Sequence, residues 1–278
     1  MRGLLLFLGF VGLIGCDQGP ADERAAAIPQ RIVSLDYCAD QYVLKFVPPE
    51  RILAVSPDAA KPFSYMRAQA VGLTQIAPRA ETILALKPDL IVRSYGGGPN
   101  ALSFFNQAGI PVLQVGWASD LEGMMGVVQE MATGLGAEAA GRVEVERMRD
   151  RLEAIVGQAD HQALYMTPGG VTSGPGSLVH EILQAAGYEN YLSQTGWHDL
   201  PLEMLVQRQP DQIVYARFDS HVTPWSRARH PIAQRVLETR PVTEIEGAWT
   251  SCGGWFLVDA IEALVPSETP DSNQKAGR

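Results

Sequence analysis

The sequence is poor in positive charge and in histidine. Its 22 Lys and Arg residues are outnumbered by 31 Asp and Glu residues, the net charge is −9, and there are only 5 His residues. No long basic run exists, and this excludes nucleic acid as a partner because phosphate binding needs clustered Lys and Arg. The few histidines are scattered, so the spacing of His, Cys and Asp indicates neither a metal site nor a catalytic cluster.

The sequence motifs of common enzymes and nucleotide-binding proteins are also missing. His180-Glu181 begins like the metalloprotease pattern HExxH, but Gln184 stands where the second histidine would be. No Gly-x-Ser-x-Gly elbow is present, and the glycine-rich stretches 95–99 and 168–170 lack a following Gly-Lys-Ser/Thr. We therefore expect no enzyme activity and no cofactor. We interpret the glycines as backbone that a ligand can approach closely at a cleft.

The N-terminus carries an apolar run of limited length. Arg2 precedes the apolar residues 3–14, and Gly15-Cys16 follows them. The run is shorter than the roughly 20 residues of a membrane-spanning helix, but it fits an export signal. Its Leu-Ile-Gly-Cys ending resembles the bacterial lipoprotein signal, in which the cysteine is lipidated. The alternative is an ordinary secretory signal with a chance cysteine.

The ends of the chain are expected to lie outside the fold. We assign residues 1–16 to the signal, with Cys16 as the first mature residue, and residues 17–29 to a tether. Residues 266–278 have the polar composition of a disordered tail.

The most informative feature is a segment that occurs twice. Residues 81–92 (ETILALKPDLIV) and residues 203–214 (EMLVQRQPDQIV) share a glutamate, a Pro-Asp pair and a final Ile-Val at the same spacing. Each copy predicts a short helix that ends near its proline and a buried strand after it. The repetition therefore predicts two lobes of similar design.

Strand and helix patterns alternate on both sides of a long helical region. The expected strands are 31–35, 51–56, 89–94, 111–116, 163–167, 212–216 and 242–247. This order predicts an α/β fold with two similar lobes, mostly parallel sheets and one long helix that joins them. We expect an N-terminal lobe at 30–136, a linking helix at 137–158 and a C-terminal lobe at 159–265. Ligands gather at the carboxyl ends of parallel strands, so we expect the ligand cleft between the lobes.

Such a chain resembles the periplasmic binding proteins of ABC importers for ferric siderophores, haem and cobalamin. The resemblance rests on the twin segments, on RIVSLDYCAD (31–40) and on PGGVTSGPGSLVHEILQAAGYEN (168–190). It implies a periplasmic protein that is tethered to the inner membrane and delivers its ligand to a permease dimer. In this family a glutamate on each lobe docks into permease arginines, and Glu81 and Glu203 match those positions. The alternative is that each glutamate only stabilises its helix N-terminus.

The candidate ligand contacts lie in or near the strand-end loops. Aromatic side chains there suit a large flat ligand, and an arginine at a strand end in each lobe would favour a carboxylate or catecholate. The candidates are Tyr37, Cys38, Tyr65, Arg93, Tyr95, Trp117, Arg217, Trp249 and Cys252. For Cys38 and Cys252 three interpretations stay open: two buried thiols, a disulfide between the lobes, or contacts to the ligand.

We therefore expect a binding protein that captures a metal chelate. The two arginines favour a ferric siderophore, with cobalamin or another corrinoid and haem as alternatives. A metal-storing or catalytic periplasmic lipoprotein is the alternative from another class, and a convergent His, Cys and Asp cluster in the cleft would favour it.

Overall fold

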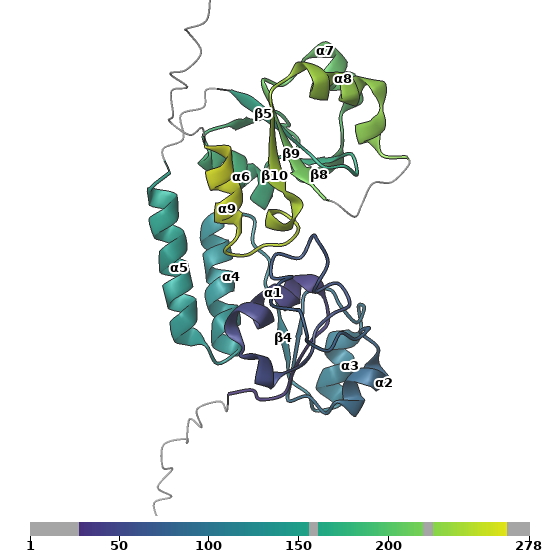
Figure 1. The fold of residues 1–278 in the computed structure, drawn as a ribbon, viewed down its shortest axis with the longest axis vertical. Helices are drawn as coiled ribbons and strands as arrows, with labels where there is room; N and C mark the ends of the chain where they lie inside the picture. The colour runs from purple at the N-terminus through teal and green to yellow at the C-terminus, as the bar shows by residue number, and fades with distance from the viewer. Residues whose placement is uncertain (1–27, 156–160, 219–224, 266–278) are drawn as a thin grey trace, which may run out of the picture.

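The computed structural model describes residues 28–155, 161–218 and 225–265. It consists of two α/β lobes stacked along the long axis, with two helices, α4 (Leu121–Gly134) and α5 (Glu138–Glu153), along one side (Figure 1). The expected signal with Cys16, nearly all of the tether and the C-terminal tail lie outside the described residues.

The N-terminal lobe is built on a four-stranded parallel sheet with the order β2-β1-β3-β4. Its strands are β1 (Ile32–Ser34), β2 (Ile52–Ala54), β3 (Leu90–Arg93) and β4 (Val112–Gln114). Its helices are α1 (Tyr37–Phe46), the short 3-10 helix η1 (Pro49–Arg51), α2 (Ala80–Ala85) and α3 (Ala101–Gln107). Buried branched residues dominate β1 and β3, as expected of strands covered on both faces.

The C-terminal lobe repeats this plan with the order β10-β9-β5-β7, again parallel. Its strands are β5 (Gln162–Met166), β7 (Glu189–Asn190), β9 (Gln212–Arg217) and β10 (Val242–Glu246). Its helices are α6 (Leu178–Ala185), α7 (Leu202–Gln207), α8 (Pro231–Thr239), α9 (Leu257–Leu264) and the 3-10 helices η2 (Arg227–Arg229) and η3 (Gly247–Trp249). An antiparallel pair, β6 (Val171–Ser173) with β8 (Trp197–Asp199), is added to this plan.

The aspartate of each repeated Pro-Asp pair has the same structural role. Asp89 precedes β3, and its carboxylate accepts hydrogen bonds from the backbone N–H groups of Gln30 and Arg31, both at 2.8 Å. Asp211 precedes β9, and its carboxylate accepts one from Gln162 at 3.0 Å. Each aspartate therefore ties the start of its own strand to the start of the neighbouring strand, β1 or β5.

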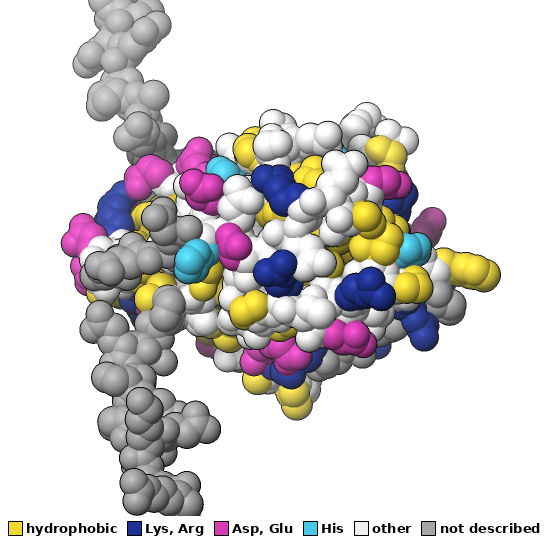
Figure 2. All heavy atoms as spheres, turned by 90° about the horizontal axis from the view of Figure 1, so that it is seen from above, with side chains coloured by type: hydrophobic (Ala, Val, Ile, Leu, Met, Phe, Trp, Pro, Cys, Tyr) yellow, Lys and Arg dark blue, Asp and Glu magenta, His cyan; other side chains and the backbone are white. Residues whose placement is uncertain are grey.

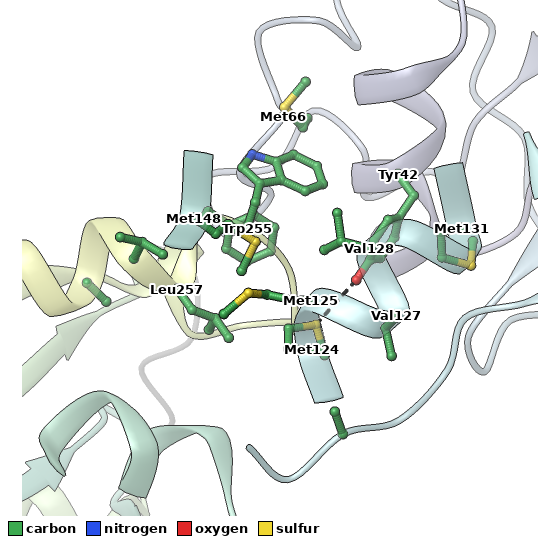
Figure 3. Packing of buried hydrophobic residues seen from close by; sticks show 14 of the residues in the cluster. Tyr42, Met66, Met124, Met125, Val127, Val128, Met131, Met148, Trp255 and Leu257 are labelled. Carbon is green, nitrogen blue, oxygen red and sulfur yellow. Dashed lines mark hydrogen bonds between the residues drawn. The ribbon is translucent and has the colours of Figure 1, made fainter. Parts of the chain in front are cut away.

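The two lobes share one hydrophobic core, and this core fixes their position relative to each other. Helix α4 packs against α5, and α5 continues along the molecule to the C-terminal lobe (Figure 1). The loop before α9 inserts Trp255 against Tyr42 of α1, while Met124 of α4 contacts the Tyr42 hydroxyl at 3.6 Å (Figure 3). These contacts connect both lobes to the same buried cluster. At about 1.5 Å per residue, the 16 residues of α5 span about 24 Å.

The structure confirms the predicted α/β fold of two similar lobes with mostly parallel sheets. The linking helix expected at 137–158 corresponds to α5, which ends at Glu153. Within the three described ranges, no helix is both long enough and apolar enough to cross a bilayer.

Candidate ligand-binding site

A cavity of about 460 Å³ lies between the lobes. The loops that follow β3 and β4 and the first turn of α4 form its N-lobe wall. The start of α6, the turn before β8 and the loop 250–253 form its C-lobe wall. The cavity therefore lies where the carboxyl ends of both parallel sheets meet, which is the usual ligand position in such sheets.

Two tryptophans from opposite lobes flank the cavity. Trp117 follows β4 and is 81% exposed, and Trp197 begins β8 and is 55% exposed. Large aromatic faces left this accessible on both sides of a cavity suit a broad, flat ligand, because aromatic side chains give much contact area. Each face is held by a different lobe, so a ligand between them would contact both lobes.

The rest of the lining is apolar or neutral. Leu178, Val179 and Ile182 of α6, with Leu257 of α9, contribute apolar surface. The hydroxyl groups of Ser94, Ser177, Thr250 and Ser251 and several backbone groups contribute the polar part. No Arg, Lys, His, Asp or Glu is among the described residues that line the cavity. The site can thus make neutral hydrogen bonds but offers no charge to an anionic ligand.

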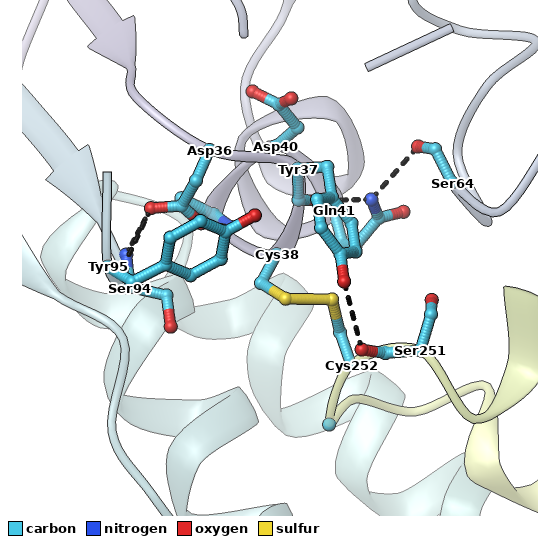
Figure 4. Close-up of a disulfide and its surroundings, with 12 residues drawn as sticks. Asp36, Tyr37, Cys38, Asp40, Gln41, Ser64, Ser94, Tyr95, Ser251 and Cys252 are labelled. Carbon is cyan, nitrogen blue, oxygen red and sulfur yellow. Dashed lines mark hydrogen bonds between the residues drawn. A yellow bond between two sulfur atoms is a disulfide. The ribbon is translucent and has the colours of Figure 1, made fainter. Parts of the chain in front are cut away.

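Cys38 and Cys252 form a disulfide between the lobes (Figure 4). Cys38 lies in the first turn of α1, Cys252 lies in the loop after η3, and their Cα atoms are 5.5 Å apart. Both residues also line the cavity. Of the three interpretations that the sequence leaves open for Cys38 and Cys252, the structure shows the disulfide between the lobes.

Hydrogen bonds around the disulfide join the same two lobes. The Tyr37 hydroxyl donates to the carbonyl of Ser251 at 3.4 Å (Figure 4). The Ser251 hydroxyl donates to the carbonyl of Phe63 at 2.8 Å. The ring of Tyr37 packs edge-on against Phe63 and Tyr95. Burial, and secondarily the Asp36 carboxylate, raises the pKa of Tyr37, so its hydroxyl remains a neutral donor.

The glycine-rich loop after β3 is held by two buried charged residues. Asp36 accepts hydrogen bonds from the N–H groups of Ser94, Tyr95 and Gly96 at 2.7–3.0 Å and also caps α1. The Arg93 guanidinium donates to the carbonyls of Gly96 and Gly98. A Cβ at Gly96 would lie 2.5 Å from the Leu35 carbonyl oxygen. The glycine at position 96 is therefore required because the Leu35 backbone passes close to it, and not because a ligand does.

The other predicted contacts divide between the cavity and the framework. Of the candidates, Cys38, Trp117 and Cys252 line the cavity, while Tyr37 and Tyr95 lie beside the disulfide. Arg93 is buried and serves the loop backbone rather than the cavity. Arg217 lies 3.1 Å from Glu244 and lines a smaller cavity of about 220 Å³ with Arg67 and Glu246.

Tyr65 and Trp249 are also placed in the framework. The Tyr65 hydroxyl donates to Asp259 at 2.7 Å, and its ring stacks on Phe256 with the ring centroids 4.6 Å apart. Trp249 is partly buried against the shared core and does not line the cavity. The second tryptophan of the cavity is instead Trp197, which the sequence pattern does not indicate because β6 and β8 are each only three residues long. A tryptophan directly after Gly196, in a turn before the repeated segment, is the signal that could have indicated it.

Glu81 and Glu203 occupy matching positions on the two lobes. Each is exposed and lies in the first turn of a six-residue helix, α2 or α7. Neither helix has a side-chain N-cap, so a carboxylate in the first turn also complements the helix terminus. Their docking role remains a prediction.

The described residues contain no group of three or more His, Cys, Asp and Glu side chains arranged to hold a metal ion. The cluster that would favour a metal-storing or catalytic protein is thus absent from the described part of the cavity. The two cysteines that line the cavity are bonded to each other and are not free ligands.

Comparisons with known proteins agree with this architecture. The sequence profile of a family described as "Periplasmic binding protein" matches residues 32–245. An uncharacterized ABC transporter substrate-binding lipoprotein of Bacillus subtilis is 23% identical, with 96% of each chain covered. A vitamin B12-binding protein of Pectobacterium atrosepticum is 28% identical over 86% of this chain and 88% of its own.

The solved structure of a periplasmic heme-binding protein from Roseiflexus superposes with a TM-score of 0.67. It is 19% identical, and the match covers 85% of this chain and 98% of that one. A likeness at this identity supports the fold alone. The family is one of binding proteins, and this chain is accordingly not an enzyme. The matched residues 32–245 include every strand of both parallel sheets except the last residue of β10. They also include most of both cavity walls. The chain therefore belongs to the periplasmic binding protein family.

Proposed function

We propose that this chain is the substrate-binding lipoprotein of an ABC importer and that it captures a corrinoid between its lobes. The observation that carries the proposal is the uncharged cavity flanked by Trp117 and Trp197. Relatives named as an ABC transporter substrate-binding lipoprotein and as a vitamin B12-binding protein, both matched over most of their length, support it.

The chemistry of the cavity suits a corrinoid better than haem. A corrin ring is broad and flat and carries neutral amide side chains, which the hydroxyl groups of Ser94, Ser177, Thr250 and Ser251 can serve. Its cobalt is held by the macrocycle, so the protein need not supply a metal ligand. Haem carries two carboxylates and usually takes an axial His, Cys, Met or Tyr. Among the described residues that line the cavity, the side chains of these types are Cys38 and Cys252, which are bonded to each other, and Met124, which is 2% exposed.

This arrangement gives a ferric siderophore less support than it gives a corrinoid. The expectation of a siderophore depended on Arg93 and Arg217 facing the ligand, because guanidinium groups bind carboxylates and catecholates. Arg93 instead holds the glycine loop, and Arg217, which pairs with Glu244, lines a second, smaller cavity with residues of both lobes rather than the cavity of the two tryptophans. A strongly anionic chelate would therefore meet no compensating charge from the described lining residues.

The remaining parts of the proposal concern the membrane. Lipidation at Cys16 would tether the protein, and the exposed Glu81 and Glu203 would contact arginines on two permease subunits. The sequence resemblance and the matched positions of the two glutamates support this. The docking glutamates would then lie on α2 and α7, which do not line the ligand cavity between the lobes.

Titration of the purified protein with cyanocobalamin, haem and ferric catecholate and hydroxamate siderophores tests the ligand class. We expect one saturable site per chain for cyanocobalamin, with quenching of part of the tryptophan fluorescence, and no comparable site for the other compounds. Trp117→Ala and Trp197→Ala should each weaken binding about tenfold or more, equivalent to about 1.4 kcal/mol. Trp225→Ala is the matched control, since Trp225 is 93% exposed and does not line the cavity.

Calorimetry should accompany the fluorescence, because cyanocobalamin absorbs light in the range of tryptophan emission. Saturable binding of haem or of a siderophore, with no binding of cobalamins, would show that the ligand assignment is wrong. An equal effect of all three tryptophan variants would show that the cavity is not the site.

A further inference from the structure

One buried tyrosine lies behind the C-lobe wall of the cavity. Tyr165 is in β5, is 2% exposed and does not itself line the cavity. Side chains alternate along a strand, and its neighbours Leu164 and Met166 belong to a separate cluster that contains residues of α7 and α8. Tyr165 belongs to the core that the two lobes share. Its ring therefore packs on the side of the sheet that faces this shared core.

The ring of Tyr165 contacts the tryptophan of the C-lobe wall. The ring centroids of Tyr165 and Trp197 are 6.2 Å apart, and the ring planes meet at 73°, which is the favourable edge-on arrangement. Trp117 in the opposite wall makes no aromatic contact within the described residues. A side chain that is already held in place loses less conformational freedom when a ligand binds. Trp197 is therefore the more pre-organised of the two aromatic faces.

The hydroxyl of Tyr165 contacts a second residue of the same wall. Burial raises the pKa of Tyr165, so its hydroxyl stays protonated and needs an acceptor. Its only hydrogen-bond partner within the described residues is Thr250 Oγ1, at 2.9 Å. Thr250 in turn donates its own proton to the carbonyl of Gly247 at 3.3 Å. A threonine hydroxyl has one proton and two lone pairs, so one lone pair of Thr250 is left to accept a hydrogen bond from a ligand.

The two residues that Tyr165 contacts come from different segments of the lobe. Trp197 begins β8, whereas Thr250 follows η3, and both line the cavity. Tyr165 thus connects an aromatic face to a hydrogen-bond acceptor at a fixed spacing. A flat ring against Trp197 with an N–H group directed at Thr250 would match both contacts. The primary amides at the edge of a corrin ring carry such N–H groups, and a carboxylate does not.

We propose that Tyr165 is a positioning residue of the ligand site, which holds the Trp197 ring and the Thr250 acceptor in place and so favours a flat ligand with an amide N–H at its edge. This inference rests on the proposed capture of a corrinoid and adds a residue that acts without touching the ligand. Precise sites depend on such supporting residues behind the residues that make contact. The effect of replacing Tyr165 should therefore act through Trp197 and Thr250.

The first test needs no ligand. The chain has five tryptophans, and fluorine NMR of protein labelled with fluorotryptophan gives a separate signal for each. Trp197→Phe and Trp117→Phe assign the two cavity signals. We expect Tyr165→Leu to shift or broaden the Trp197 signal and to leave the Trp117 signal unchanged. Tyr165→Phe keeps the ring, so its Trp197 signal should stay close to that of the wild type.

Tyr191→Leu is the matched control for the loss of a buried tyrosine ring. Tyr191 is 1% exposed in the same lobe but belongs to the cluster that contains residues of α7 and α8. Figure 2 shows the outer surface of that end of the lobe, with mixed apolar and charged side chains, whereas the cavity lies on the interlobe side. The control should lower the melting temperature and leave both tryptophan signals unchanged. A Trp197 signal that responds equally to both Leu variants would overturn the proposal.

Affinities for cyanocobalamin then test the coupling between the residues. Tyr165→Leu should weaken binding about tenfold or more, but less than about threefold when Trp197→Ala is already present, because both changes remove one contact. Tyr165→Phe should weaken binding about threefold, and should have no effect when Thr250→Val is already present. Effects that multiply in both pairs would overturn the proposal. The Phe variant decides the question if the Leu variant does not fold.

The two experiments separate this inference from the proposed function. If the fluorine signals respond as expected but cyanocobalamin does not bind the wild type, the corrinoid assignment fails and the positioning of Trp197 stands on the fluorine signals. If cyanocobalamin binds and the Tyr165 variants change neither its affinity nor the Trp197 signal, only the positioning role fails.

Discussion

Removal of the interlobe disulfide should lower the free energy of unfolding by about 3–5 kcal/mol. The bond joins residues 214 positions apart, and the entropy of closing a loop of that size corresponds to about 5 kcal/mol at 25 °C as an upper value. The effect acts chiefly on the unfolded chain, because interlobe contacts such as Tyr42 with Gly253 and Tyr65 with Asp259 do not require the bond. A folded chain is stable by only about 5–15 kcal/mol, so such a loss is large.

The assay compares oxidised wild type, reduced wild type and the double variant Cys38→Ser with Cys252→Ser in urea. The reduced wild type and the variant should have the same urea midpoint, and in thermal unfolding both should melt about 10 °C or more below the oxidised protein. The variant itself should not respond to reductant, which controls for effects of the reductant alone. Equal unfolding midpoints for oxidised and reduced wild type would refute the reasoning, as would two free thiols found by alkylation and mass spectrometry.

Three further predictions concern titration, anchoring and docking. Burial raises the pKa of Asp40 to about 6, so its contribution to stability is complete below pH 4 and is lost as the pH rises through 6. Between pH 5 and pH 7.5 the free energy of unfolding of the wild type should fall by about 1 kcal/mol more than that of Asp40→Asn. An equal change in the wild type and the variant would contradict this. Cys16→Ser should release the protein from membranes. An unmodified N-terminus of the mature wild-type protein, found by mass spectrometry, would contradict lipidation at Cys16. Arg in place of Glu81 and Glu203 should impair uptake more than Ala, because repulsion adds to lost attraction, and cyanocobalamin affinity measured alongside should not change.

The alternation of strands and helices could be predicted from the sequence because it depends on local patterns. The Pro-Asp pairs at 88–89 and 210–211 mark equivalent points in both lobes, and the hydrogen bonds of Asp89 and Asp211 explain why each copy needs them. The pair β6 and β8 could not be predicted, since strands of three residues have too little periodicity to register.

The candidate site was less predictable because it depends on where side chains point. A strand-end arginine can face a cleft or turn back to carbonyl oxygens, and only the three-dimensional structure places Arg93 against Gly96 and Gly98. In the same way, the sequence placed both Trp249 and Cys252 near one strand end, but Cys252 reaches the cavity while Trp249 packs against the core. The disulfide partner of Cys38 could not be predicted from local patterns, because it lies 214 positions away in the sequence.

The disulfide also determines when the binding site can be completed. An exported chain emerges from its N-terminus, so Cys38 is exposed to the oxidising compartment long before Cys252 arrives. The N-lobe sheet, complete by Gln114, can form in that interval, but the cavity lacks its closing loop 250–253 until almost the whole chain has crossed. Completion of the cavity is therefore a late step in the folding of this chain, and a chain truncated before Cys252 would leave Cys38 without its partner.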